Sequence, residues 1–231
     1  MKVQTIVRLR WGAALLVLAG LQYVVLEAVT AAAWRTPTYD YAVDFISDLG
    51  NPVAGDVFDG RVVNSPLHLV MDTAFVAQGV LFIAAFTLLG VAVTGRLRTV
   101  LLTLAIVHGV GVILVGFFHE SSAALTNGVI VVHSVGAAAT ILAGNVIAIV
   151  VGAAGRRWST PSWLRVANVA IGILGLAAFV LLQADNSLYH SAGGVPERIA
   201  VYTILAFEVL AGATVLRHTR RRAAPRRVLI N

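Results

Sequence analysis

Residues 128–151 read GVIVVHSVGAAATILAGNVIAIVV, a run of 24 residues that contains no Lys, Arg, Asp or Glu. An α-helix rises about 1.5 Å per residue and the hydrocarbon core of a bilayer is about 30 Å thick, so about 20 apolar residues can cross it. This stretch therefore predicts a membrane-spanning helix.

Five further runs on either side meet the same criterion. The six expected spans cover about 11–33, 67–93, 100–118, 128–151, 163–182 and 198–216. Pro66, Pro161 and Pro196 each stand where a first helical turn is expected, which supports three of the boundaries. We predict an all-α fold: a polytopic six-transmembrane-helix bundle in a single domain, 1–231, that ends in a basic tail at 217–231.

The composition excludes a disordered chain or an ordinary soluble protein, because 58% of the 231 residues are hydrophobic and only 12% are charged. The sequence contains no cysteine, which excludes disulfides, thiolate metal sites and iron–sulfur clusters. The net charge of +6 is carried mostly by short segments between the apolar runs, so we expect no nucleic-acid partner. The basic tail is expected to fix topology and to contact anionic lipid head groups.

Basic residues divide unevenly between alternate connecting segments. One side holds fourteen of them, including the termini, and the other holds Arg35, Arg61 and Arg198. Cytoplasmic segments carry the excess of Lys and Arg in multi-spanning proteins. The split predicts a multi-pass protein in the cytoplasmic membrane of a prokaryote with both termini in the cytoplasm. The first run contains Gln22 and Glu27 and is longer than a signal-peptide core, so we expect it to be retained.

No acidic residue falls in a predicted cytoplasmic segment, and most acids and histidines map to the outer loops or outer helix ends. We therefore expect any site to open outward. The candidate residues of this outer pocket are Ser47, Asp48, His68, Asp72, His119, Glu120, His133, Glu197 and Arg198.

The segment 39–50 within the first outer loop has a helical pattern of polar and apolar residues. Asp40, Asp44 and Asp48 recur at intervals of four, beside a stripe formed by Tyr41, Phe45 and neighbouring residues. This pattern predicts a short amphipathic helix at the outer interface, with its acids in solvent.

A metal site is a second interpretation of the outer histidines. His68 and Asp72 lie four positions apart, and His119 and His133 belong to helix ends on the same side. Two or three imidazoles with a carboxylate suit Zn²⁺ with an open position for water. No cofactor is predicted as established, but zinc at these four residues is one hypothesis; the other is that each histidine ties helices together by hydrogen bonds.

Four polar residues are expected near mid-depth in the spans: Gln22, Gln78, His108 and Glu208. A charged glutamate in hydrocarbon costs several kcal/mol, so Glu208 should be neutral, paired or next to water. A His108–Glu208 pair is conceivable. We interpret this layer as structural, with a proton pathway as the alternative.

Several short motifs resemble a known family. Residues 46–50 read ISDLG, residues 116–120 read GFFHE, His133 follows in the next span, and residues 194–199 read GVPERI. These resemble the bacterial and archaeal membrane-protein family labelled domain of unknown function 998, in order and over nearly the whole chain. His119 stands where a proline is usual in that family. The resemblance implies a six-helix bundle without a known activity, and it implies family-like outer positions at Ser47, Asp48, Gly50, His133, Glu197 and Arg198.

These observations leave three functional hypotheses. The leading one is an accessory or binding protein that recognises a lipid head group or a partner subunit at its outer face, since small residues let the helices pack closely and no complete catalytic constellation is present. The alternatives are a metal-dependent hydrolase of a lipid or envelope substrate, and a proton-coupled transporter. Membrane lipids are the expected partners, a membrane protein is a second one, and the sequence does not predict an oligomeric state.

The orientation can be measured directly. A reporter that is active only in the periplasm, fused after Asn231, should be inactive, because the basic residues hold that end in the cytoplasm. Strong reporter activity in cells would contradict the predicted topology.

Overall fold

The computed structural model describes residues 3–223, with side chains described as far as Arg220. The described part leaves out residues 1–2 and 224–231. These include Lys2, Arg226 and Arg227, three of the basic residues from which the orientation is predicted. Within the described part, six helices are long and apolar enough to cross a membrane. They are α1 (Val3–Ala33), α2 (His68–Leu89), α3 (Gly95–Phe117), α5 (Val129–Ala154), α6 (Ser162–Ala184) and α8 (Gly194–Ala223).

The predicted six-helix bundle is confirmed, and each helix covers most of its predicted span. Most of the helices are longer than the apolar run that identified them, because their first and last turns carry polar residues. The prolines lie where the sequence indicated: Pro161 directly precedes α6, and Pro196 is in the first turn of α8.

The six long helices form a closed ring in sequence order. Each packs on the one before it, and α8 completes the ring by packing on both α6 and α1. Glycines allow the closest approaches: a Cβ at Gly111 on α3 would lie 2.6 Å from the carbonyl oxygen of Gly136 on α5. Such contacts let backbones meet where the bilayer offers little hydrophobic drive for association.

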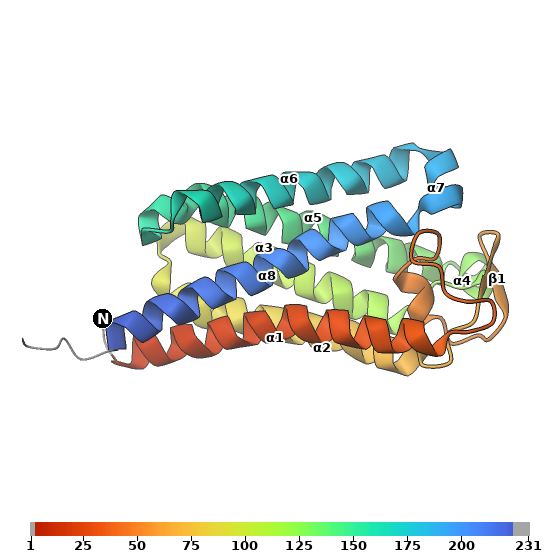
Figure 1. The fold of residues 1–231 in the computed structure, drawn as a ribbon, viewed down its shortest axis with the longest axis horizontal. Coiled ribbons are helices and arrows are strands. Elements are labelled where there is room, and N and C mark those ends of the chain that lie inside the picture. The colour runs from red at the N-terminus through yellow and green to blue at the C-terminus, as the bar shows by residue number, and fades with distance from the viewer. Residues whose placement is uncertain (1–2, 224–231) are drawn as a thin grey trace, which may run out of the picture.

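All the longer connections lie at one end of the bundle, at the right of Figure 1. They contain the 3₁₀ turn η1 (Ser47–Gly50), the hairpin β1 (Asp56–Phe58) and β2 (Arg61–Val63), and the short helices α4 (Ser122–Asn127) and α7 (Asn186–Ala192). At the opposite end are the short 3₁₀ turns η2 (Gly90–Ala92) and η3 (Gly155–Trp158), together with the start of α1 and the end of α8 (Figure 1). We call residues 34–67 the cap.

The predicted amphipathic helix at 39–50 is wrong. Only η1 is helical there, and the preceding residues form turns. The physical reason is that the aspartates bind nearby backbone amides: Asp40 accepts from the amide of Ala42, Asp44 from that of Asp40, and Asp48 from that of Phe45, at 2.7–2.8 Å. These local bonds compete with helical ones. The acids are also not a solvated stripe, since Asp48 is completely buried.

The cap closes the end of the bundle with its own apolar side chains. Trp34, Ile46, Leu49 and Phe58 are buried in one cluster with residues of the long helices, among them Phe75 of α2. The antiparallel hairpin turns at Asp59-Gly60, both with positive φ, as a two-residue hairpin requires. The cap is therefore part of the core and holds its polar residues against the helix ends.

Candidate functional site

The polar layer beneath the cap is organised around Arg198, in the first turns of α8. Its Nη1 donates to the carbonyl oxygens of Tyr41 and Asp44, both at 2.8 Å, and its Nη2 donates to the hydroxyl of Tyr39. Its Nε lies 3.3 Å from Oε1 of Glu27 on α1, which is almost fully buried. One guanidinium thus links the cap, α1 and α8.

A second buried ion pair lies inside the cap. Arg61 on β2 places Nε 3.1 Å and Nη2 3.2 Å from the two carboxylate oxygens of Asp48 in η1. The guanidinium also lies 4.3 Å from the ring centre of Phe45, a cation–π distance. Burial opposes the charge of Arg61, but its hydrogen bonds to Asp48 outweigh burial and raise the Arg61 pKa above its ordinary value. This pair connects the hairpin to η1.

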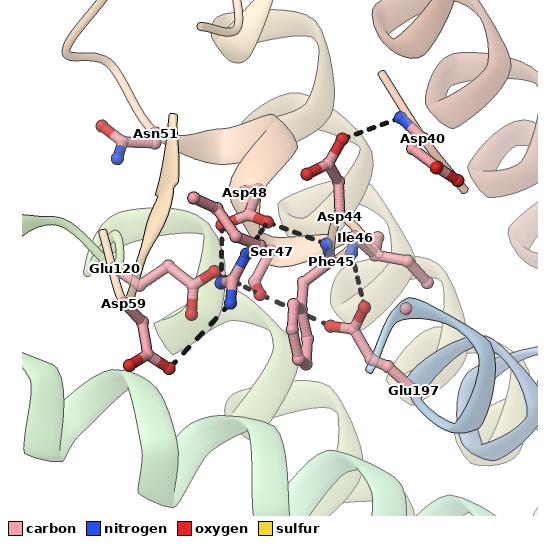
Figure 2. A network of polar contacts seen from close by, with 12 residues as sticks. Asp40, Asp44, Phe45, Ile46, Ser47, Asp48, Asn51, Asp59, Glu120 and Glu197 are labelled. Carbon is pink, nitrogen blue, oxygen red and sulfur yellow. Dashed lines mark hydrogen bonds and ion pairs between the residues drawn. The ribbon is translucent and has the colours of Figure 1, made fainter. Parts of the chain in front are cut away.

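Ser47 lies between two glutamates from different parts of the chain. Its Oγ donates to Oε1 of Glu120 at 2.6 Å and lies 3.4 Å from Oε1 of Glu197. The other oxygen of Glu197 accepts the amide of Ile46 at 2.5 Å. Figure 2 shows the two carboxylates approaching Ser47 from opposite sides. The sequence motif that contains Ser47 is therefore fastened to the end of α3 and the start of α8.

The surroundings of Glu120 favour its neutral form. Burial raises its pKa well above the ordinary value, and the charge of Asp48 raises it further, against the hydrogen bond from Ser47. Its second oxygen lies 3.6 Å from Nε2 of His133, whose Nδ1 lies 2.7 Å from the carbonyl oxygen of Phe118. The Ser47 hydroxyl therefore lies beside a carboxyl group of raised pKa. Such a pair can exchange a proton, as general acids and bases do.

The remaining outer candidates form one further pair. Nε2 of His119 lies 3.2 Å from Oδ2 of Asp72, and this hydrogen bond, opposed by burial, raises the His119 pKa. His68, at the start of α2, is in neither histidine–carboxylate pair and is partly exposed. Among the side chains of residues 3–220, no three His, Asp or Glu are grouped as a metal site would require. Zinc at His68, Asp72, His119 and His133 stays a sequence-based hypothesis.

The four mid-membrane residues do not form one continuous layer. Gln22 donates to the carbonyl oxygen of Ala74 at 3.3 Å and contacts Gln78 at 3.5 Å, and Gln78 donates to Oε1 of Glu208 at 2.6 Å. His108 instead has Nδ1 2.9 Å from the carbonyl oxygen of Thr140. The conceivable His108–Glu208 pair is therefore not formed, because each residue is bonded to a different helix neighbour.

Sequence analysis missed several members of the polar layer. Glu27 was noted only as a polar residue of the first span, and Arg61 only as a basic residue of the less basic side. Asp56, which accepts from Ser122 and Asn51, was only one of the acids of the outer loops. A signal existed for Arg61, since Asp59-Gly60 between β-prone residues is typical of a hairpin that brings Arg61 back. No local signal predicts that Glu27 meets Arg198.

A family model described as protein of unknown function (DUF998) matches residues 17–214. The chain belongs to the DUF998 family. The match covers the cap, four whole spans and most of the first and sixth spans, so the resemblance inferred from the short motifs is confirmed. No curated protein and no solved structure matches the chain significantly.

The buried pair in the cap gives a stability prediction. Arg61→Met should lower the free energy of unfolding in detergent by about 3–5 kcal/mol, because it leaves Asp48 charged, buried and unpaired. Arg35→Met, at an exposed arginine of the same loop, is the matched control and should change little. Adding Asp48→Asn to Arg61→Met should restore part of the loss, and a double variant no more stable than the single one would contradict this account.

Glu120 gives a prediction for pH. A carboxyl group whose pKa is raised in the folded protein favours folding less and less as pH rises above its ordinary value of 4.5. The raised pKa of His119 has the same sign, since its contribution is complete below 6.5 and is lost as pH rises. Thermal unfolding should thus occur at lower temperature as pH rises from 4.5 through 6.5 and above.

The variants Glu120→Gln and His119→Gln separate the two groups. Each should flatten part of the pH dependence, and the double variant should flatten it more than either single variant. If Glu120→Gln leaves the slope unchanged, then Glu120 is not the buried neutral acid described above.

Proposed function

We propose that this protein binds a membrane lipid at the outer end of its bundle, with an acyl chain lying between α6 and α8. The observation that carries the proposal is a groove of about 570 Å³ between these helices, next to the polar layer. Its lining residues are Tyr41, Ala42, Ile171, Leu174, Val195, Arg198, Ile199, Tyr202, Thr203 and Ala206.

The groove has the polarity of a lipid. Tyr41 and Arg198 lie at the end nearest the cap, whereas Ile171 and Leu174 of α6 and Ala206 of α8 line its deeper part. From Arg198 to Ala206 the helix rises about 12 Å, which is most of the roughly 15 Å of hydrocarbon in one leaflet. An acyl chain lying along this stripe would leave its head group beside the cap.

The charge at the polar end favours a zwitterionic head group over an anionic one. The donors of Arg198 are already directed at the cap and at Gly194, and Glu27 compensates its charge. Both oxygens of Glu27 also accept from Tyr202 at 3.0 Å. Tyr41 remains half exposed, with its ring over the guanidinium at 4.8 Å. Tyrosines at this depth are typical of the membrane interface, and their rings attract an ammonium group.

The excess of basic residues on the side that holds both termini supports the outer leaflet as the source of this lipid. The cap and the polar layer lie at the end opposite the start of α1 and the end of α8 (Figure 1). With both termini in the cytoplasm, as the basic residues predict, the groove opens into the leaflet that faces outward.

The test is to fill the groove. Ala206→Trp places a large side chain against its deep part, and Ala28→Trp, on the exposed face of α1, is the matched control. Both variants are purified in nanodiscs that contain phosphatidylethanolamine and phosphatidylglycerol, and the lipid that remains after transfer to detergent is measured by native mass spectrometry.

The native protein and Ala28→Trp should retain about one phosphatidylethanolamine per chain, and Ala206→Trp should lose most of it, because the side chain occupies the volume of the acyl chain. Equal retention of lipid by all three proteins would overturn the proposal that the groove binds an acyl chain. A preference for phosphatidylglycerol that Ala206→Trp removes would overturn the proposal that the head group is zwitterionic.

A further inference from the structure

A second cavity, of about 500 Å³, lies at the end of the bundle opposite the cap. It is lined by residues of all six long helices, with η2 and η3 beside it. Its deep part is apolar, with Leu16, Phe86 and Phe207 among the lining residues. A site of this size is in the range that holds one drug-sized ligand.

The end of this cavity that lies farthest from the cap is basic. Arg98 at the start of α3, Arg157 in η3 and His218 near the end of α8 all line it. None of the described residues that line it is Asp or Glu. This is the opposite of the outer groove, where Glu27 compensates Arg198. The unpaired positive charge favours an anion at this end.

A polar group without a partner lies between the basic end and the apolar part. Asn168 of α6 lines the cavity and is 2% exposed, and its Oδ1 is buried without a hydrogen-bond partner in the structure. Six residues after the start of α6, it lies about 9 Å deep along the helix. A buried amide without a partner is costly, so its presence on a cavity wall indicates a ligand with a hydrogen-bonding group at that depth.

We propose that this cavity binds an anionic amphiphile with a single hydrocarbon chain. The phosphate or carboxylate lies at Arg98, Arg157 and His218, a hydroxyl or N–H group beside the linkage to the chain donates to Oδ1 of Asn168, and the chain lies against Leu16, Phe86 and Phe207. The site differs from the outer groove in its place, its charge and its enclosure, and it does not depend on the proposed function.

The enclosure argues for one chain rather than a bilayer phospholipid with two. Six helices and two turns surround the cavity, whereas the outer groove is lined by only two transmembrane helices and the cap. A ligand therefore enters from the end of the bundle, between the arginines. On the orientation predicted from the sequence, this is the cytoplasmic side.

The experiment uses the full chain in detergent and three probes with oleoyl chains. Lysophosphatidic acid has one chain and an anionic head group, lysophosphatidylcholine has the same chain with a zwitterionic head group, and phosphatidic acid has two chains. Trp158 lines the cavity, so a brominated chain should quench its fluorescence, and Trp158→Phe identifies that part of the signal.

Lysophosphatidic acid should bind most tightly, and replacing both Arg98 and Arg157 by Gln should weaken its binding by about tenfold or more. The matched control replaces Arg96 and Arg156 by Gln. These exposed neighbours in the same segments do not line the cavity, so the net charge falls equally while binding should change less than about twofold. Asn168→Leu should also weaken binding, with the unfolding temperature reporting that the variant is folded.

Three results would overturn the inference. An equal loss in the Arg96 and Arg156 control would reduce the effect to diffuse surface charge, equal binding of lysophosphatidylcholine would remove the role of the anion, and equal binding of phosphatidic acid would identify an ordinary bilayer-lipid contact. Ala206→Trp should leave lysophosphatidic acid binding unchanged, which separates a failure here from a failure of the outer groove.

Discussion

The cap end of this DUF998 protein depends on the burial of one guanidinium, that of Arg198. An arginine so deeply buried is tolerated only when its charge is paired and its donors are occupied. Glu27 supplies the charge, and the cap supplies carbonyl and hydroxyl oxygens. Because these partners come from α1 and from residues 39–44, the cap cannot move away from the bundle without exposing several unpaired groups at once.

The same requirement applies to the buried acids Asp48 and Glu120, whereas Asp40 and Asp59 of the first loop are exposed. Asp48 is paired with Arg61, and Glu120 shares the hydroxyl of Ser47 in a place where a charged carboxylate is disfavoured. The cap thus has few free polar groups. The groove at this end is lined by Tyr41 at the edge of the cap and mostly by apolar residues of α6 and α8, so the lipid proposed above would meet this groove and not an open polar pocket.

Sequence analysis predicted the spans because hydropathy and length decide them with little help from tertiary contacts. It failed at residues 39–50, where helical spacing and local hydrogen bonding by aspartate favour different structures, and the local bonds prevail. It gathered Ser47, Glu120 and Glu197 at one end from topology alone, but could not pair them. The partners of Arg198 and Asp48 depend on how distant segments fold back, which neither periodicity nor composition records.

The contact between Glu27 and α8 also constrains the order in which the protein is assembled. The Tyr202 hydroxyl that donates to Glu27 lies 175 positions later in the chain, in the last helix to be synthesised. Until α8 has crossed the membrane, Glu27 has neither Tyr202 nor Arg198 beside it and the cap lacks its anchor. Completion of the cap end therefore coincides with insertion of the sixth span, and a chain truncated before α8 carries an uncompensated acid within its first span.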